Sequence, residues 1–265
     1  MFRNLTIGQH YPVDSPIHDL DPRLKIIMTI IFIISLFLIE SFTSFLFVIV
    51  FLAIAITISR VPLKFVIRGL RPILFIILIT FIINLLMTPG RVIFTLAFIK
   101  ITEEGLRQAG FMAVRLTLLI MGTSLLTLTT SPIILTDGIE SLLNPFKRFG
   151  LPAHELAMMM TIALRFIPTL MEETEKIMKA QKSRGADFES GNIMSRAKNL
   201  VPLLVPLFIS AFRRADELAM AMEARCYRGG ENRTRMRQMK ISKGDYAAAF
   251  VFTVYLAAVI IFKIW

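Results

Sequence analysis

Two short segments of the chain each contain an arginine in the same local sequence pattern. The first reads Ala180-Gln-Lys-Ser-Arg184-Gly185 and the second reads Ala221-Met-Glu-Ala-Arg225-Cys226. In both, an alanine precedes the arginine by four positions and a small residue stands directly before it. Residues four apart share one face of a helix, so the alanine leaves space beside the arginine side chain.

An arginine in this setting is suited to binding a partner. Its guanidinium is a planar fork of donors that fits carboxylate and carbonyl oxygens, and small neighbours allow a partner's backbone to approach closely. A local explanation is the alternative, because basic residues offset the negative end of a helix and glycine commonly follows a helix. Since two such ends occur in one region, we favour two similar docking sites and a paired partner.

The other polar residues form no recognisable catalytic or metal-binding set. No Gly-Lys dipeptide is present, which excludes a phosphate-binding P-loop. His10, His18 and His154 are scattered, with no cysteine or carboxylate at ligand spacing, so we predict no metal site. The single cysteine, Cys226, cannot form an internal disulfide. We therefore expect a non-catalytic protein without a cofactor of its own.

The elements that must carry the two arginines belong to a strongly apolar chain. Of its 265 residues, 55% are apolar and 18% are charged. In a soluble domain about a quarter of the residues are charged. A bilayer span needs about 20 apolar residues in a helix. The sequence therefore predicts an all-α, polytopic membrane protein with about five spans. They correspond to the charge-free runs 26–39, 41–59, 72–90, 116–136 and 246–262.

The distribution of positive charge predicts the orientation of these spans. The net charge is +11, and with a cytoplasmic N-terminus 25 of the 30 Lys and Arg residues face the cytoplasm. Lysine and arginine in excess mark cytoplasmic loops. We expect a multi-pass protein of the cell (inner or plasma) membrane with its N-terminus inside and its C-terminus outside. Nucleic acid is not an expected partner, because no basic stripe with interleaved aromatics occurs.

The predicted domains follow from these spans. Residues 1–130 form an N-terminal four-span membrane domain, 131–243 a cytoplasmic coupling domain with the two arginine-tipped helices, and 244–265 a C-terminal transmembrane helix. The first span is expected to begin at Pro22, because aspartate is a good N-cap and proline suits the first helical position. The fourth helix is expected over 104–129.

About three long amphipathic coupling helices are predicted in the cytoplasmic domain. The first covers 137–149, the second begins near Pro152 and carries an apolar stripe, and the third covers 206–227. The apolar stretch 199–212, interrupted by two prolines, has two interpretations. It could be a short kinked span, but its 14 residues are fewer than a span needs. We favour amphipathic helix at the inner face of the membrane.

Taken together, these segments resemble a known family. The chain resembles the transmembrane coupling subunit, or T component, of energy-coupling factor (ECF) transporters, which are importers related to ABC transporters. The resemblance covers nearly the whole length. It rests on Leu20-Asp-Pro-Arg-Leu-Lys25, Leu164-Arg-Phe-Ile-Pro168, Gln181-Lys-Ser-Arg-Gly-Ala-Asp187, Ala211-Phe-Arg-Arg-Ala-Asp-Glu217 and Glu223-Ala-Arg-Cys-Tyr-Arg-Gly229.

The resemblance implies a role for the two arginine ends. In this family two Ala-Arg-Gly-like triplets at the ends of coupling helices dock into grooves of two ATPase subunits. The positions that match the triplets are Ser183, Arg184, Gly185, Ala224, Arg225 and Cys226. The chain departs from the commoner alanine at Ser183 and from the commoner glycine at Cys226.

The resemblance also implies the function of the whole chain. It would be a scaffold that holds a homo- or heterodimer of ATPase subunits, which bind the ATP, and a separate S component in the membrane, which captures a vitamin or a trace metal. The alternative is a stand-alone carrier or channel. Such proteins place ionisable or other strongly polar groups within their spans, and only Arg115 and the amide of Asn84 qualify here, so we favour the scaffold.

Overall fold

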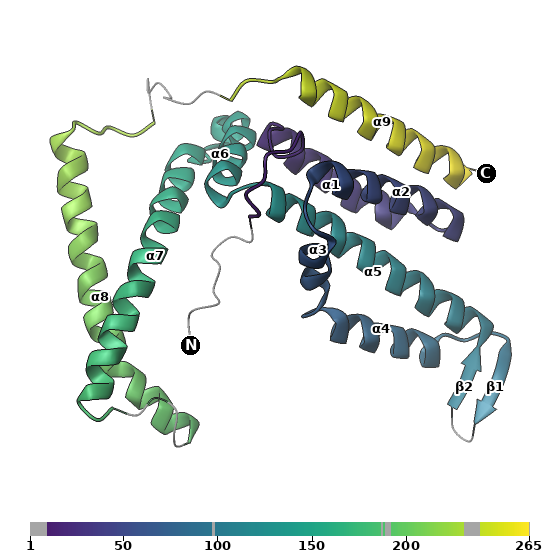
Figure 1. Cartoon of the computed structure of the whole chain (residues 1–265), viewed down its shortest axis with the longest axis horizontal. Helices are drawn as coiled ribbons and strands as arrows, with labels where there is room; N and C mark the ends of the chain where they lie inside the picture. Colours follow the sequence, from purple (N-terminus) through teal and green to yellow (C-terminus); the bar gives the residue numbers. More distant parts are fainter. Residues whose placement is uncertain (1–9, 97–98, 187, 189–191, 231–238, 265) are drawn as a thin grey trace. The chain divides into compact units, whose positions relative to one another are not determined.

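The computed structural model describes residues 10–96, 99–186, 188, 192–230 and 239–264 (Figure 1). Over these ranges the chain forms helices and one two-stranded hairpin. The prediction of an all-α polytopic membrane protein is confirmed.

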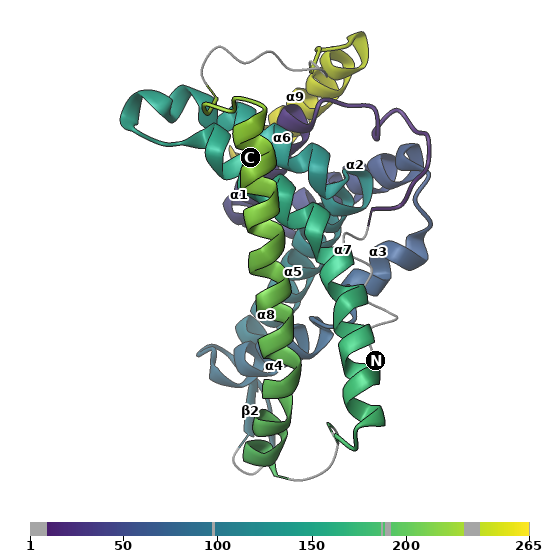
Figure 2. The same cartoon turned by 90° about the vertical axis from the view of Figure 1, so that its left-hand side faces the viewer.

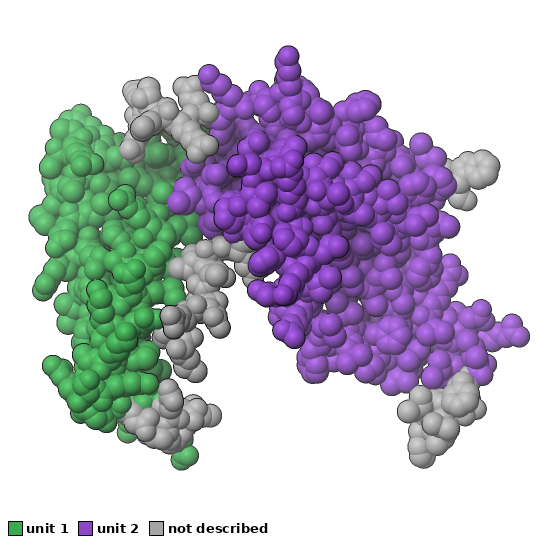
Figure 3. All heavy atoms as spheres, in the orientation of Figure 1, with its two compact units in different colours: residues 1–7, 140–236 green, residues 8–139, 237–265 purple. Residues whose placement is uncertain are grey.

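The chain divides into two compact units, shown in different colours in Figure 3. The bundle unit comprises residues 8–139 and 237–265, and the long-helix unit comprises residues 1–7 and 140–236. The bundle unit holds all the apolar runs from which the spans were predicted. The long-helix unit holds both arginine ends.

The helices of the bundle unit follow the apolar runs of the sequence. Stretches of α2, α5 and α9 are each long and apolar enough to cross a membrane, and α3 with α4 qualifies as a pair bent by 56°. With 17 residues, α1 lies at the lower limit for a span. The elements are α1 (Pro22–Leu38), α2 (Phe42–Ser59), α3 (Leu63–Leu70), α4 (Leu74–Met87), β1 (Val92–Leu96), β2 (Ile99–Thr102), α5 (Glu103–Thr129), the first part of α6 (Pro132–Leu143) and α9 (Lys243–Ile264).

Two segments between the apolar runs contain regular structure. The basic stretch before the third apolar run contains α3, whose Val66 is buried against the bundle. The segment after α4 forms an antiparallel hairpin in which Thr95 is the register partner of Lys100. Its strands are rich in β-branched and aromatic residues, which favour extended backbone.

The core of the bundle unit lies between α1, α2, α5 and α9. Phe45 and Leu36 are almost fully buried in it, and the ring centroids of Phe45 and Phe111 are 4.7 Å apart. On α9, Phe252 and Tyr255 belong to the same cluster. In a bilayer such contacts contribute through van der Waals packing, since lipid is as apolar as the side chains. The last span is therefore packed against the first ones.

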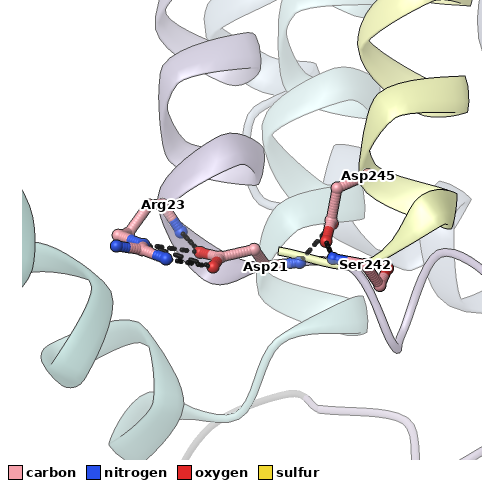
Figure 4. A network of polar contacts seen from close by, with 4 residues as sticks. All are labelled: Asp21, Arg23, Ser242 and Asp245. Atoms are coloured by element: carbon pink, nitrogen blue, oxygen red, sulfur yellow. Dashed lines mark hydrogen bonds and ion pairs between the residues drawn. The ribbon is translucent and has the colours of Figure 1, made fainter. Parts of the chain in front are cut away.

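A group of four polar residues, the α1–α9 staple, joins the first helix to the last (Figure 4). Asp21, the N-cap of α1, accepts from the backbone N–H of Arg23 at 2.8 Å and forms an ion pair with its guanidinium at 2.6 Å. The buried carboxylate of Asp245 accepts from the backbone N–H of Asp21 at 2.7 Å and from that of Ser242 at 2.6 Å. The predicted start of α1 at Pro22 is confirmed.

Two cations, the buried Lys25 and the partly buried Arg115, connect α5 to the ends of α1. The ammonium of Lys25 donates to the backbone oxygen of Thr129 at 3.1 Å and to the hydroxyl of Thr130 at 3.3 Å. The guanidinium of Arg115 donates to the backbone oxygen of Ile39, directly after α1, at 2.6 Å. A cation near a helix C-terminus offsets the negative end of its dipole. Arg115 thus has a structural contact inside the bundle.

The long-helix unit departs from the predicted helix bounds at two places. The helix expected over 137–149 is observed as α6, which begins at Pro132, followed by a 3₁₀ helix, η1 (Asn144–Phe149). The helix expected to begin at 206 is α8 (Ile193–Ala224), which continues through both of its prolines. The helix expected from Pro152 is confirmed as α7 (Ala153–Ser183).

The stretch 199–212 lies within α8 as an uninterrupted part of this amphipathic helix. Among the described residues, no candidate span includes it. Its place inside one continuous helix of 32 residues favours the amphipathic interpretation over a separate short span, and its position at the inner face of the membrane stays a prediction.

Candidate functional site

The first arginine is the C-cap residue of α7. The backbone N–H of Gly185 donates to the oxygen of Lys182 at 3.0 Å, and that of Ala186 donates to the oxygen of Gln181 at 3.0 Å. Gly185 has φ = 86°, in the left-handed region. This combination is a Schellman motif, which ends a helix and satisfies its last carbonyl groups. Arg184 therefore stands at the outermost position of α7.

The second arginine is the C-cap residue of α8 and repeats this backbone arrangement. The N–H of Cys226 donates to the oxygen of Glu223 at 2.8 Å, and the N–H of Tyr227 donates to that of Met222 at 3.0 Å. Cys226 stands at the position equivalent to Gly185 and has a left-handed backbone conformation, with φ = 56°. A side chain costs about 1 kcal/mol there. The motif thus forms at Cys226, where a glycine would be unstrained.

Both predicted triplets are exposed. This holds for all six residues: Ser183, Arg184, Gly185, Ala224, Arg225 and Cys226. Because the Schellman bonds already satisfy the last carbonyl groups of each helix, the arginine side chains are not needed to cap them. Within the described part of the chain, no hydrogen bond or ion pair engages either guanidinium. Both guanidinium groups are therefore available to a partner, and the docking role of the two triplets stays a prediction.

The two helices run antiparallel, so their arginine ends point in opposite directions (Figures 1 and 2). The guanidinium of Arg214 on α8 bonds to the carboxylate of Glu173 on α7 at 3.0 Å. Each arginine tip lies eleven residues beyond this ion pair along its own helix. At about 1.5 Å per residue, Arg184 and Arg225 are on the order of 30 Å apart along the pair.

A second contact holds the first tip against α8. Pro206 has no N–H, so the oxygen of Pro202, four residues earlier, lacks its helical donor. The side-chain amide of Gln181 on α7 donates to this oxygen at 3.4 Å. Gln181 precedes Arg184 by less than one helical turn, so this contact fixes the place where α7 ends on α8. The two prolines in an apolar stretch were the sequence signal for an accessible carbonyl.

A cavity of about 640 Å³ lies between the two helices next to the second tip. Most of its lining residues are apolar and include Ile162, Phe166 and Leu170 on α7 and Ala211, Ala215 and Leu218 on α8. Its charged lining residues are Arg214 within α8, Glu223 near the end of α8 and Arg228 after it.

The rest of α8 presents a long apolar surface, which we call the α8 face. Its seven large apolar side chains are all exposed: Leu200, Val201, Leu204, Val205, Phe208, Ile209 and Phe212. A contiguous exposed apolar surface marks an interaction site. The second half of the candidate site is therefore a surface for an apolar partner, beside two tips for a polar one.

The sequence analysis missed a contact at the base of α7. Nδ1 of His154, in the first turn of α7, lies 3.0 Å from the carboxylate of Glu140 on α6. The same imidazole packs against Gly230, in the segment that follows the second tip. The consecutive glycines 229 and 230 were the only local signal for such a close approach.

These groups are suited to binding. Over the ranges that the structure describes, no three His, Cys, Asp or Glu residues gather as a metal ion would require. The exposed cations at the tips and the α8 face are the features available to a partner.

Comparison with known proteins identifies relatives along the full chain. Residues 14–236 match the family model of the cobalt transport protein CbiQ. The chain is also similar to proteins named energy-coupling factor transporter transmembrane protein EcfT. The one from Thermosediminibacter oceani is 64% identical over 96% of both chains. Those from Clostridium kluyveri and Bacillus subtilis are 58% and 49% identical, over at least 99% of each chain.

Proposed function

The chain belongs to this family of energy-coupling factor transporter transmembrane proteins, and we propose that it is the coupling scaffold of an ECF-type importer. In this role it links ATP hydrolysis by a pair of ATPase subunits to movement of a separate S component. The S component binds the substrate, a vitamin or a trace metal. The scaffold is not an enzyme and holds no cofactor, because the ATPase subunits bind the ATP.

The observation that carries the proposal is the matched pair of arginine ends. Both arginines are exposed C-cap residues of the same backbone motif. Two equivalent arginine ends would fit two equivalent grooves, and a homo- or heterodimer of ATPase subunits would provide such a pair of grooves. Carbonyl and carboxylate oxygens in each groove would accept from the guanidinium fork. The small residues beside each arginine let the groove walls approach.

The α8 face supplies the second half of the coupling. Its apolar side chains would pack on the S component, because helices associate in or at a membrane through close apolar contact. When ATP closes the ATPase pair, the two tips are displaced relative to one another. Since the tips are the ends of helices that touch at Glu173 and Arg214, their displacement changes the crossing of α7 and α8. The S component resting on α8 would then tilt.

This arrangement requires the tips to face the ATP-containing compartment. The excess of Lys and Arg on one side of the spans supports a cytoplasmic N-terminus and cytoplasmic tips. Such an orientation in the cell membrane brings α7 and α8 within reach of soluble ATPase subunits.

Charge reversal at the two tips tests the proposal. Arg184→Glu and Arg225→Glu, alone and combined, are coexpressed with the ATPase and S subunits, and the complex is captured through a tag on this chain. We expect each single variant to lose most ATPase capture and the double variant to lose all of it. Uptake of substrate by the reconstituted complex should fall in parallel.

A matched control separates docking from net charge. Lys179→Glu makes the same charge change on the exposed surface of α7, one turn before the tip, and should retain capture and uptake. Normal uptake by the double variant would contradict the docking role. Uptake by this chain alone, reconstituted without other subunits, would instead support a stand-alone carrier.

A further inference from the structure

Three segments of the long-helix unit meet at His154. The residue lies in the first turn of α7, its partner Glu140 lies on α6, and Gly230 lies five residues beyond the second arginine tip. Residues 140, 154 and 230 are distant in sequence, so the contact exists only through the fold. At this contact the segment that follows α8 packs against the first turn of α7.

The contact with Gly230 depends on the missing side chain of that residue. A Cβ atom placed there would lie 2.5 Å from Cδ2 and 2.7 Å from Cγ of His154. Ordinary contact between carbon atoms is about 3.5–4.0 Å. Imidazole and backbone are therefore pressed together at a distance that only glycine permits. The neighbouring Gly229 has φ = 90°, which directs the chain into this contact.

The imidazole is held from its other side by a carboxylate. An ionised carboxylate only accepts hydrogen bonds, so Nδ1 of His154 is the donor to Glu140. The Glu140 side chain is 12% exposed and that of His154 is 31% exposed. Nε2 of His154 is buried and has no partner among the described residues. One bond and one packing contact thus determine the orientation of the ring.

We propose that His154 is a positioning residue that sets the place of the Arg225 tip relative to α7, through its contacts with Glu140 and Gly230. This inference rests on the proposed docking function. The tip is joined to Gly230 by four residues, of which Cys226 and Tyr227 are already bound into the Schellman motif. The other end of α7 carries Arg184. Holding the Arg225 tip against the start of α7 therefore keeps the two arginines at a defined separation.

The test adds a methyl group to the contact and then removes the ring that it meets. Gly230→Ala introduces the clash, and His154→Ala removes Cγ and Cδ2, the two atoms that the new methyl group would meet most closely. In the combined variant the methyl group meets Cβ of residue 154 at 3.0 Å and no ring atom. Gly110→Ala is the matched control, since a Cβ atom at Gly110 would meet nothing within 4 Å.

The first measurement is the distance between the two tips. Spin labels on the exposed native Cys226 and on Lys179→Cys report it in the full-length chain in nanodiscs, without other subunits. We expect Gly230→Ala to shift or broaden the distance distribution and the combined variant to return it toward that of the wild type. His154→Ala alone should broaden it. An unchanged distribution in both Gly230→Ala and His154→Ala would overturn the proposal.

The second measurement is ATPase capture by chains with the native Lys179 and no labels. We expect Gly230→Ala to reduce capture about tenfold, a typical effect of overpacking, and the combined variant to recover part of it. Normal capture by Gly230→Ala while Arg225→Glu abolishes it would overturn the positioning role. Normal capture by Arg225→Glu would instead contradict the docking function, whatever the distance measurement shows.

Discussion

The bundle unit and the long-helix unit use the same helical structure in opposite ways. In the bundle unit, aromatic residues such as Phe45 and Phe252 are buried, and the polar groups at the helix ends bond to one another. In the long-helix unit, α8 exposes aromatic residues such as Phe208 and Phe212, and among its described residues it buries Leu203. The bundle unit thus has a buried aromatic core, although it also exposes side chains such as Phe75 and Phe250, whereas most of the described large apolar side chains of α8 are exposed.

This difference separates stability from function along the chain. Substitutions in the bundle unit should change the unfolding of the isolated chain, whereas those on α7 and α8 should change assembly. The predictions below compare the two units directly, or compare the two tips within one unit. They run from the largest expected effect to the smallest.

Removal of a phenylalanine ring gives the strongest contrast. Phe45→Ala deletes a side chain that is 2% exposed and packs on Phe111, and should cost about 3 kcal/mol of unfolding free energy. Phe208→Ala deletes one that is 60% exposed and should change that free energy by less than about 0.5 kcal/mol. Thermal unfolding of the detergent-purified chain measures both.

Assembly should show the reverse order. Phe208→Ala is expected to weaken capture of the S component, while Phe45→Ala, assayed below its unfolding temperature, should retain it. Equal unfolding temperatures for the two variants would contradict the division of roles between the units.

Removal of an aspartate extends the comparison to polar groups. Asp245→Ala leaves the N–H groups of Asp21 and Ser242 without their acceptor and should cost about 2 kcal/mol. The exposed Asp216 on α8 is the control, and Asp216→Ala should leave unfolding nearly unchanged. The unfolding temperatures of the two variants measure this difference. An Asp245→Ala protein that unfolds at the wild-type temperature would show that the staple does not stabilise the bundle unit.

The Asp21–Arg23 ion pair should make the bundle unit sensitive to acid. The side-chain hydrogen bond that Arg23 donates to the carboxylate of Asp21 lowers the pKa of Asp21 below the usual 3.8. A carboxyl group with a lowered pKa stabilises the fold fully above its unfolded value and loses this effect as pH falls through its folded value. Asp21→Asn keeps a good N-cap and should cost about 1 kcal/mol near pH 7.

A pH series of unfolding temperatures checks this prediction. The difference between wild type and Asp21→Asn should shrink as the pH falls below about 4. A constant difference down to pH 2 would mean that the carboxylate charge does not contribute.

The smallest effect concerns the two tips. Cys226→Gly removes the cost of a side chain at φ = 56° and should stabilise the second tip by about 1 kcal/mol. Gly185→Ala introduces that cost at the first tip and should destabilise it by a similar amount. Hydrogen exchange at the amides of Tyr227 and Ala186 should slow in the first variant and quicken in the second. Changes of the same sign in both would refute the shared motif.

The parts of the structure that could be predicted are those encoded by local pattern. The start of α1 follows from Asp21 and Pro22, whose effects act within the first helical turn. The arginine tips were recognisable because a helix end and its cap involve only neighbouring residues. The start of α8 was predicted 13 residues too late, because its prolines were taken as a boundary although the helix accommodates both.

The sequence by itself thus determined that the chain is a helical membrane protein and which residues form the two exposed arginine ends. Apolar run length and capping depend on residues within a few positions of each other. Only the tertiary structure decided that the tips point in opposite directions, that Asp245 bonds to the start of α1 and that His154 meets Gly230. These contacts join residues 41, 224 and 76 positions apart, respectively, and no local pattern specifies which distant groups packing will bring together.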